Sequence, residues 1–253
     1  LEPIAAAGLP AETAPLIEEL NRLLARLSDA FDKQRAFVAD AAHELRSPLT
    51  ALSLQLQLLD RARDDTARQA ARTQLRGAIE RAIHLATQLL TLARQEPPAE
   101  PAQLVPTALE TCASEGIADV HALAEERRVA LSLESDPALT VAGDPDALRI
   151  LVRNLVDNAV RYSPPGGCVK VGISGPTATA AVQLAVEDAG AGIPPAERER
   201  AFDRFFRRPD SAEGGTGLGL AIVRAIADRH GAQVRLEDAM PHGLRVVVTW
   251  PRA

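Results

Sequence analysis

The feature that most constrains this fold is a series of apolar residues, spaced by four and three residues in turn, in the first third of the chain. Its members are Leu20, Leu24, Leu27, Phe31 and Val38. Gln34 is the one polar interruption of the series. Because this spacing keeps the residues on one side of an α-helix, it is typical of coiled coils. It predicts a long helix from near Thr13 or Pro15 to about Arg63.

A second series keeps the spacing but is offset by one residue, so we expect the helix to adjust locally between Val38 and Ala42. It comprises Ala42, Leu45, Leu49, Leu52, Leu56 and Leu59. The polar stretch 61–66 interrupts the pattern, and a second helix is expected beyond it. Its apolar stripe is predicted to be Leu75, Ile79, Ala82, Ala86, Leu89 and Ala93. A helical hairpin alone buries only one stripe per helix, so we expect a homodimer in which two hairpins form a four-helix bundle.

Three prolines within residues 95–101 cannot continue a helix, because proline lacks the amide donor, and this stretch is interpreted as a linker. The remainder is predicted to be α/β. Helices are expected at about 106–127 and 144–162. Strands are expected at 129–134, 138–142, 168–174, 179–187, 232–238 and 244–250.

Composition excludes several classes of protein. A content of 46% hydrophobic and 25% charged residues is typical of a globular chain, and a net charge of −6 argues against nucleic-acid binding. Cys112 and Cys168 are too far apart for a metal or redox pair and are expected to be buried thiols. No apolar run reaches the roughly 18 residues of a membrane span. Since the chain starts at Leu1, we expect a soluble fragment of a longer protein whose membrane part is missing.

The segment 37–50 contains a histidine with the neighbours needed for nucleophilic chemistry. His43 directly follows Ala42, so its side chain should project about 100° from the apolar series, within reach of another domain. Glu44 can accept the proton of one ring nitrogen and so make the other more nucleophilic. Pro48 should bend the helix. An exposed histidine on a helix, taken alone, is most often without function.

A second motif, 154–162, places Asn154 and Asn158 on one helical face. Their carbonyl oxygens suit Mg²⁺, a cation that prefers oxygen ligands and retains several waters. Ordinary surface asparagines would explain the pair about as well.

Two further motifs contain glycines. One comes directly after a predicted strand, and the other is a loop that leads into a predicted helix. In 186–195, Asp188 at a strand end can accept a hydrogen bond from an exocyclic amine, and the nearby glycines allow a ring to approach the backbone. In 214–223, a glycine-rich loop leads into an apolar helix, a junction suited to anions. There is no GxxxxGK[ST] motif, which excludes an ordinary P-loop.

Between these motifs, 201–208 holds three of the five phenylalanines of the chain, beside arginines. One interpretation is a small satellite core, which we expect in part for Phe202. The other is a lid over a nucleotide, with Arg204 or Arg207 near its phosphates.

Together, and in this order, the five motifs resemble the H, N, G1, F and G2 boxes of sensor histidine kinases, over about residues 30–250. The resemblance implies an α plus α/β fold: a helical hairpin forming a dimeric four-helix bundle, followed by an α/β sandwich ATP-binding domain of the GHKL, or Bergerat, type. It implies an N-terminal signalling helix at 1–30, a dimerisation and phosphotransfer hairpin at 31–95, a linker at 96–104 and a catalytic domain at 105–253.

The resemblance also assigns roles to residues. It implies that His43 accepts phosphate, with Glu44 and Ser47 as further catalytic residues, that Asn158 binds Mg²⁺, and that Asp188 anchors adenine. The residues implied to bind ATP are Asn154, Asn158, Arg161, Tyr162, Asp188, Gly190, Gly192, Ile193, Arg207, Gly215, Thr216, Gly217, Leu218 and Gly219.

The function implied is ATP-dependent autophosphorylation of His43 and transfer of the phosphoryl group to an aspartate of a cognate response regulator. The implied parent is a membrane receptor of the bacterial inner membrane whose kinase part faces the cytoplasm. One departure concerns Ser47, since kinases of this family that also dephosphorylate their regulators have Thr or Asn there. Serine keeps the hydroxyl but lacks the β-branch that fixes it, so phosphatase activity stays open.

Two other classes share part of this pattern. A GHKL ATPase of the chaperone, mismatch-repair or topoisomerase kind would have the nucleotide motifs but no reason to carry the His43 motif on a hairpin. A non-catalytic scaffold would bind nucleotide only to report a signal, and the intact Asn158, Asp188 and glycine loops argue against it. Whether transfer occurs within or between subunits depends on the turn at 61–66 and is not predicted.

Overall fold

The computed structural model describes residues 4, 14–62, 64–95, 104–135, 139–175, 181–207 and 215–251. The chain divides into two compact units, Leu1–Ala86 and Thr87–Ala253. The predicted linker, 96–104, lies outside the described residues except for Leu104, and so does Gly214. Among the described residues, no helix is both long and apolar enough to cross a membrane.

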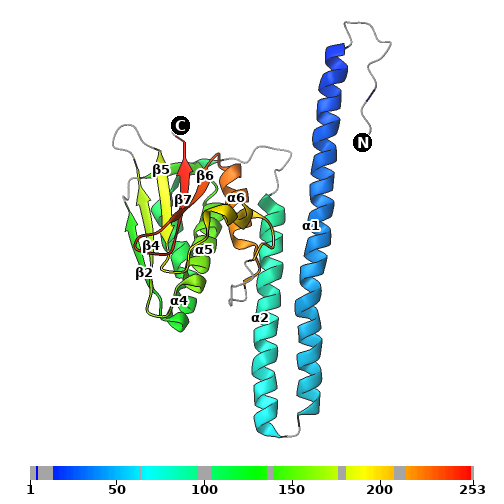
Figure 1. The fold of residues 1–253 in the computed structure, drawn as a ribbon, viewed down its shortest axis with the longest axis vertical. Coiled ribbons are helices and arrows are strands. Elements are labelled where there is room, and N and C mark those ends of the chain that lie inside the picture. Colours follow the sequence, from blue (N-terminus) through cyan, green and yellow to red (C-terminus); the bar gives the residue numbers. More distant parts are fainter. Residues whose placement is uncertain are drawn as a thin grey trace. The chain divides into compact units, whose positions relative to one another are not determined.

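Two long antiparallel helices, α1 (Ala14–Arg61) and α2 (Asp65–Gln95), form the predicted hairpin (Figure 1). α1 is continuous over 48 residues, including residues 38–42 and Pro48. The short connection ends at Asp64, whose Oδ1 accepts a hydrogen bond of 2.7 Å from the backbone N–H of Ala67. Such a bond satisfies one of the unpaired donors at a helix N-terminus, which explains why α2 starts here.

The buried stripe of α2 differs from the predicted one by a shift of one position. Ala71, Ala78, Leu85 and Leu92, spaced by seven residues, are only 2–7% exposed. Of the predicted stripe only Leu89 is buried, whereas Ile79 is 43% exposed. α2 carries two neighbouring apolar stripes, and the predicted stripe is the less buried of the two in the single chain.

The apolar series of α1 stays largely uncovered in the single chain. Leu20, Leu27, Phe31, Val38, Leu49 and Leu56 are between 41% and 59% exposed. On α2, the apolar residues Ile79, Ile83 and Leu90 are exposed as well. A hairpin with this much exposed apolar surface has a face that is suited to burial against another molecule.

The second unit is built on a five-stranded sheet in the order β2-β4-β5-β7-β6 (Figure 1). β2 and β4 are parallel, and the other neighbouring pairs are antiparallel. The strands are β2 (Ala130–Ser135), β4 (Cys168–Ser174), β5 (Val182–Glu187), β6 (Gln233–Asp238) and β7 (Leu244–Trp250). A separate antiparallel pair joins β1 (Val105–Ala108) to β3 (Thr140–Gly143).

Besides the end of α2, the helices of this unit are α3 (Leu109–Ala118), α4 (His121–Arg127), α5 (Pro145–Tyr162) and α6 (Gly219–Arg229), with short 3₁₀ turns η1 (Pro195–Glu197) and η2 (Arg200–Phe202). α5 contacts β4, β5 and α6, and α6 contacts β6. The core is aliphatic, as the low aromatic content predicts. Its fully buried side chains include Leu148, Leu151, Leu155, Leu184, Ile222 and Ile226.

The strand predictions and the helix at 144–162 are confirmed within a few residues, but the helical segment predicted at about 106–127 is confirmed only in part. Residues 105–108 form β1, and the rest divides at Asp119 and Val120 into α3 and α4. Pairing with β3, for example of Ala108 with Thr140, overrides the local helical pattern, and the Thr107 hydroxyl donates a 3.0 Å hydrogen bond to the Gly143 carbonyl. Cys112 and Cys168 are free thiols, but only Cys112 is buried as predicted.

Candidate nucleotide-binding and phospho-acceptor sites

His43 lies on α1 with an exposed side chain, as its position beside Ala42 predicts. Glu44, the next residue, is partly exposed, and Ser47, one turn further, is exposed. Because Pro48 has no N–H, the backbone carbonyl of Glu44 lacks its usual intrahelical donor. Because the side chain of His43 is exposed, its imidazole is open to solvent and to an approaching protein.

Asp188 follows β5 and is 9% exposed. Its Oδ1 accepts hydrogen bonds from the backbone N–H of Gly190, at 2.8 Å, and of Leu244, at 3.1 Å. Burial raises the pKa of this carboxyl above its ordinary value of 3.8, and the two amide bonds oppose part of the shift. Since both bonds end on Oδ1, Oδ2 is left for a donor on a ligand.

Three glycines around Asp188 bring backbone segments closer than any side chain would allow. A Cβ on Gly190 would lie 2.6 Å from the Tyr162 carbonyl oxygen, and one on Gly243 would lie 1.9 Å from that of Asp188. Gly192, with a φ of +69°, has the Gly243 carbonyl oxygen 2.9 Å from its Cβ position. The sequence motifs did not include Gly243 and Leu244, because only the pairing of β5 with β7 places them here.

The two asparagines of α5 have different environments. Asn154 is 4% exposed, and its Nδ2 donates to the Ile150 carbonyl at 2.8 Å, so its amide nitrogen is engaged within the helix. Asn158 is partly exposed and lies against the start of α6, where a Cβ on Gly219 would come within 2.7 Å of its Nδ2. The structure therefore brings Asn158, but not the amide nitrogen of Asn154, to the glycine-rich loop.

Arg161 and Tyr162 end α5. The Arg161 guanidinium holds Asp157 through two hydrogen bonds of 2.7 and 2.9 Å. The Tyr162 ring is 45% exposed, and its hydroxyl lies 3.8 Å from the Cβ position of Gly215. The C-terminal end of α5 and the beginning of the glycine-rich loop thus border one region.

The glycine-rich loop is held from two sides. At Gly217, with a φ of +72°, the carbonyl accepts a 2.9 Å bond from the N–H of Phe205. The Thr216 hydroxyl accepts a 3.3 Å bond from the N–H of Leu218 and donates to Oε1 of Gln88, a buried residue of the same unit. Leu218 and Gly219 are buried where α6 begins.

Of the two roles predicted for the phenylalanine-rich segment, the structure bears on the satellite core. Phe202 is buried, which confirms a satellite core there, and the Arg224 guanidinium lies 4.9 Å from its ring centroid. Phe206 is partly exposed, with the Arg200 guanidinium at the same distance of 4.9 Å from its ring. Arg207 is exposed.

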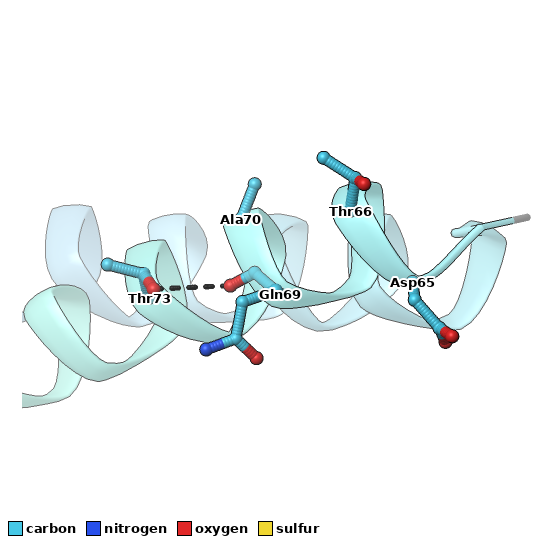
Figure 2. Close-up of a pocket in the computed structure, with 5 residues that line it drawn as sticks. All are labelled: Asp65, Thr66, Gln69, Ala70 and Thr73. Atoms are coloured by element: carbon cyan, nitrogen blue, oxygen red, sulfur yellow. Dashed lines mark hydrogen bonds between the residues drawn. The ribbon is translucent and has the colours of Figure 1, made fainter.

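A shallow hollow on the first turns of α2 is unrelated to these motifs (Figure 2). It is lined by the exposed residues Asp65, Thr66, Gln69, Ala70 and Thr73. The Thr73 hydroxyl donates to the Gln69 carbonyl at 3.1 Å, so it is engaged within the helix. None of the lining residues is a predicted site residue. Across the described part of the chain, no group of three or more His, Cys, Asp or Glu residues is placed to hold a metal ion.

An exposed histidine on a long hairpin, together with an α/β unit in which a buried aspartate lies beside glycine-rich backbone, is the arrangement expected of a phospho-acceptor protein with its own nucleotide-binding domain. Comparison with known families agrees. Residues 33–98 match the "His Kinase A (phospho-acceptor) domain", and residues 143–253 match the "Histidine kinase-, DNA gyrase B-, and HSP90-like ATPase" family, whose domain binds ATP.

The relatives are sensor kinases. The sensor protein QseC of Escherichia coli K12 is 39% identical over 251 residues, which are 98% of this chain and 55% of the relative. The histidine-protein kinase/phosphatase MprB of Mycolicibacterium vanbaalenii is 37% identical over 92% of this chain and 48% of its own length. A solved structure of a mycobacterial sensor histidine kinase MprB is 32% identical, with a TM-score of 0.51 over 58% of this chain and 97% of that one.

The chain therefore belongs to the sensor histidine kinase family, and the fold predicted from the five motifs is confirmed. It spans about half the length of the curated relatives it matches.

Proposed function

We propose that this chain transfers the γ-phosphoryl group of ATP to His43 and then to an aspartate of a response regulator. The observation that carries the proposal is the environment of Asp188. A buried carboxylate is held by two backbone amides through one oxygen and presents the other, in a chain that also displays an exposed histidine. Oδ2 is the acceptor that the exocyclic amine of adenine requires, which favours ATP as the phosphate donor.

The remaining nucleotide contacts follow from the residues around Asp188. We assign Tyr162, Ile193 and the backbone at Gly190 and Gly192 to the base and sugar. Arg161, Arg207 and the loop from Gly215 to Gly219 are assigned to the phosphates, since loop amides and a helix N-terminus favour anions. Asn154 is assigned to supporting α5, the helix that carries Arg161 and Tyr162.

Asn158 is suited to the role of a magnesium ligand. Its carboxamide is partly exposed and is confined by Gly219 at the start of the glycine-rich helix. A carbonyl oxygen is a donor that Mg²⁺ accepts, and a single protein ligand leaves room for the waters and phosphate oxygens that this ion retains. When bound, Mg²⁺ neutralises phosphate charge, which is the main requirement of phosphoryl transfer.

His43 acts as a nucleophile. Its unprotonated ring nitrogen attacks the γ-phosphorus, a P–N bond forms, the P–O bond to the β-phosphate breaks, and ADP leaves. Glu44 holds the proton on the other ring nitrogen, which favours the reactive tautomer. An aspartate carboxylate of the regulator then attacks the phosphorus, the P–N bond breaks, and His43 is regenerated.

The uncovered apolar series of α1 and the exposed stripe of α2 support a homodimer built from two hairpins. We propose the division predicted from the sequence: a signalling helix at 1–30, a phosphotransfer hairpin at 31–95, a linker at 96–104 and a catalytic domain at 105–253. The parent protein is proposed to lie in the bacterial inner membrane, with this part in the cytoplasm.

A second activity, dephosphorylation of the regulator, is proposed for Ser47. Its side chain is exposed one turn from His43, where a hydroxyl can orient an attacking water. The MprB relative is named a kinase/phosphatase, which supports this assignment.

The test is incubation of the full chain with γ-labelled ATP and Mg²⁺. We expect protein-bound label that is acid-labile, alkali-stable and absent from His43→Gln. A mixture of His43→Gln and Asn158→Ala then tests whether transfer crosses the dimer. Nucleotide binding without any label would instead indicate the scaffold class.

A further inference from the structure

Arg198, which none of the sequence motifs singled out, joins two segments of the second unit. It follows η1, and its Nε donates to the Ile193 carbonyl at 3.0 Å. From the same guanidinium, Nη1 donates to the Leu236 carbonyl at 3.3 Å and Nη2 pairs with the Asp238 carboxylate. Arg198 therefore bridges the loop after β5 to the C-terminal end of β6.

These two segments supply the amides that hold Asp188. Gly190 lies in the loop that leads to Ile193, and Leu244 begins β7, directly after the turn from β6. That turn is closed by a 3.1 Å bond from the N–H of Ala239 to the Gly243 carbonyl. If the loop and the turn separated, Oδ1 of Asp188 would lose one of its two donors.

We propose that Arg198 is a positioning residue for adenine recognition. This inference rests on the proposed binding of ATP at Asp188. Only a guanidinium presents several donors in one fixed plane, whereas the three donors of a lysine share a single nitrogen and cannot bridge the segments in the same way. The Arg198 side chain is 21% exposed and that of Asp238 is 73% exposed. The exposed ion pair is screened by water, so the two carbonyl bonds carry most of the effect.

The consequence is selectivity between purines. The carboxylate oxygen of Asp188 accepts a hydrogen bond from the exocyclic amine of adenine, whereas guanine presents a carbonyl oxygen at that ring position, which the carboxylate repels. A firmly placed acceptor discriminates best, because a mismatched base leaves buried polar groups unpaired. Loosening the segments around Asp188 should reduce the affinity for ATP more than that for GTP.

The experiment compares the full chain with Arg198→Ala and Arg198→Lys. A matched control is Arg149→Ala, which removes an arginine that holds Asp119 through bonds of 2.9 and 2.6 Å in the same unit. Calorimetry measures ATP affinity, competition measures GTP affinity, and labelling of His43 at saturating ATP measures the rate of the chemical step.

We expect Arg198→Ala to lose about tenfold in ATP affinity and about tenfold in the preference for ATP over GTP, roughly the effect of one lost charged hydrogen bond. Arg198→Lys should be intermediate, and Arg149→Ala should match the wild type. The labelling rate at saturating ATP should change by less than about twofold, because the phosphates and His43 are untouched.

A folded Arg198→Ala with wild-type affinity and preference would overturn the inference, and so would an equal loss for ATP and GTP. If Arg198→Ala does not fold, Arg198→Lys is judged by the same criteria. Failure of both the wild type and Arg149→Ala to bind ATP would instead overturn the proposed function, and this inference with it.

Discussion

The carboxamide of Asn158 packs against Gly219, where a Cβ would lie 2.7 Å from Nδ2 and 2.9 Å from Oδ1. This contact joins the helix that carries the proposed magnesium ligand to the start of the glycine-rich helix. The absence of a side chain at position 219 therefore sets the position of Asn158.

Gly219→Ala should displace Asn158 and slow the labelling of His43 by about 100-fold, the effect of a misplacement of about 1 Å in a reacting site. Gly172→Ala is the matched control, because nothing lies within 4 Å of its Cβ position and its φ is not positive. Rates are measured at saturating ATP and Mg²⁺. Equal rates in the two variants would contradict the role assigned to this contact.

Asp188→Asn should abolish measurable ATP binding while the domain stays folded. The asparagine Oδ1 can still accept from Gly190 and Leu244, but the amide NH₂ group then replaces Oδ2, so that one donor faces the exocyclic amine of adenine, another donor. The exposed Asp203→Asn is the control. Calorimetry measures the ATP affinity of both variants, and retained affinity in Asp188→Asn would exclude Asp188 as the adenine anchor.

The same variant tests the electrostatics of Asp188. Its folded-state pKa lies above the ordinary value of 3.8, so ionisation costs folding free energy. Relative to Asp188→Asn, the wild type is therefore most stable below pH 3.8. This advantage is lost as the pH rises through the raised folded-state pKa of Asp188. Denaturation of both proteins between about pH 3.5 and pH 7 should show the variant gaining relative stability as the pH rises. A constant difference would contradict the raised pKa.

His230 should give the opposite pH dependence. Its Nε2 accepts from the N–H of Asp144 at 3.0 Å, and its Nδ1 lies 2.7 Å from the Ile226 carbonyl, so the buried ring is neutral. Burial lowers its pKa from the ordinary 6.5, and the Arg229 charge acts in the same direction, while the bond to Ile226 and the Asp144 charge oppose this. Its stabilising effect is complete above pH 6.5 and is lost as the pH falls toward the lower folded-state pKa.

His230→Asn should therefore be destabilised at neutral pH, by about 1–3 kcal/mol, and this deficit should shrink on acidification. Chemical denaturation at several pH values measures it. His121→Asn, at an exposed site, is the control and should show no such deficit at neutral pH. A deficit that stays constant with pH would contradict the neutral, buried state of His230.

Leu56→Glu should convert the dimer to a monomer in sedimentation equilibrium, because it places a charge in the apolar series of α1 that we propose to pack against the partner. Leu54→Glu is the control. Both side chains are about half exposed, Leu56 at 51% and Leu54 at 54%, but Leu54 is not part of the series. If both variants dimerise like the wild type, the proposed interface is wrong.

The sequence by itself determined the parts of this protein whose signal is local. The helix carrying Asn158 and the strand ending at Glu187 follow from apolar residues that repeat with the period of each element, and the strand ending at Trp250 follows from its run of three valines at 246–248. His43, Asp188 and the glycine-rich loop were found because their order along the chain matches one family.

Only the tertiary structure decided which stripe of α2 is buried, that residues 105–108 form a strand, that Gly243 and Leu244 lie against Asp188, and that Arg198 ties the loop after β5 to β6. The physical reason is distance along the chain. The bond from Leu244 to Asp188 joins residues 56 positions apart, and it depends on the register of β5 against β7, which no local pattern encodes. The motif located the carboxylate, and the pairing of distant strands decided what holds it in place.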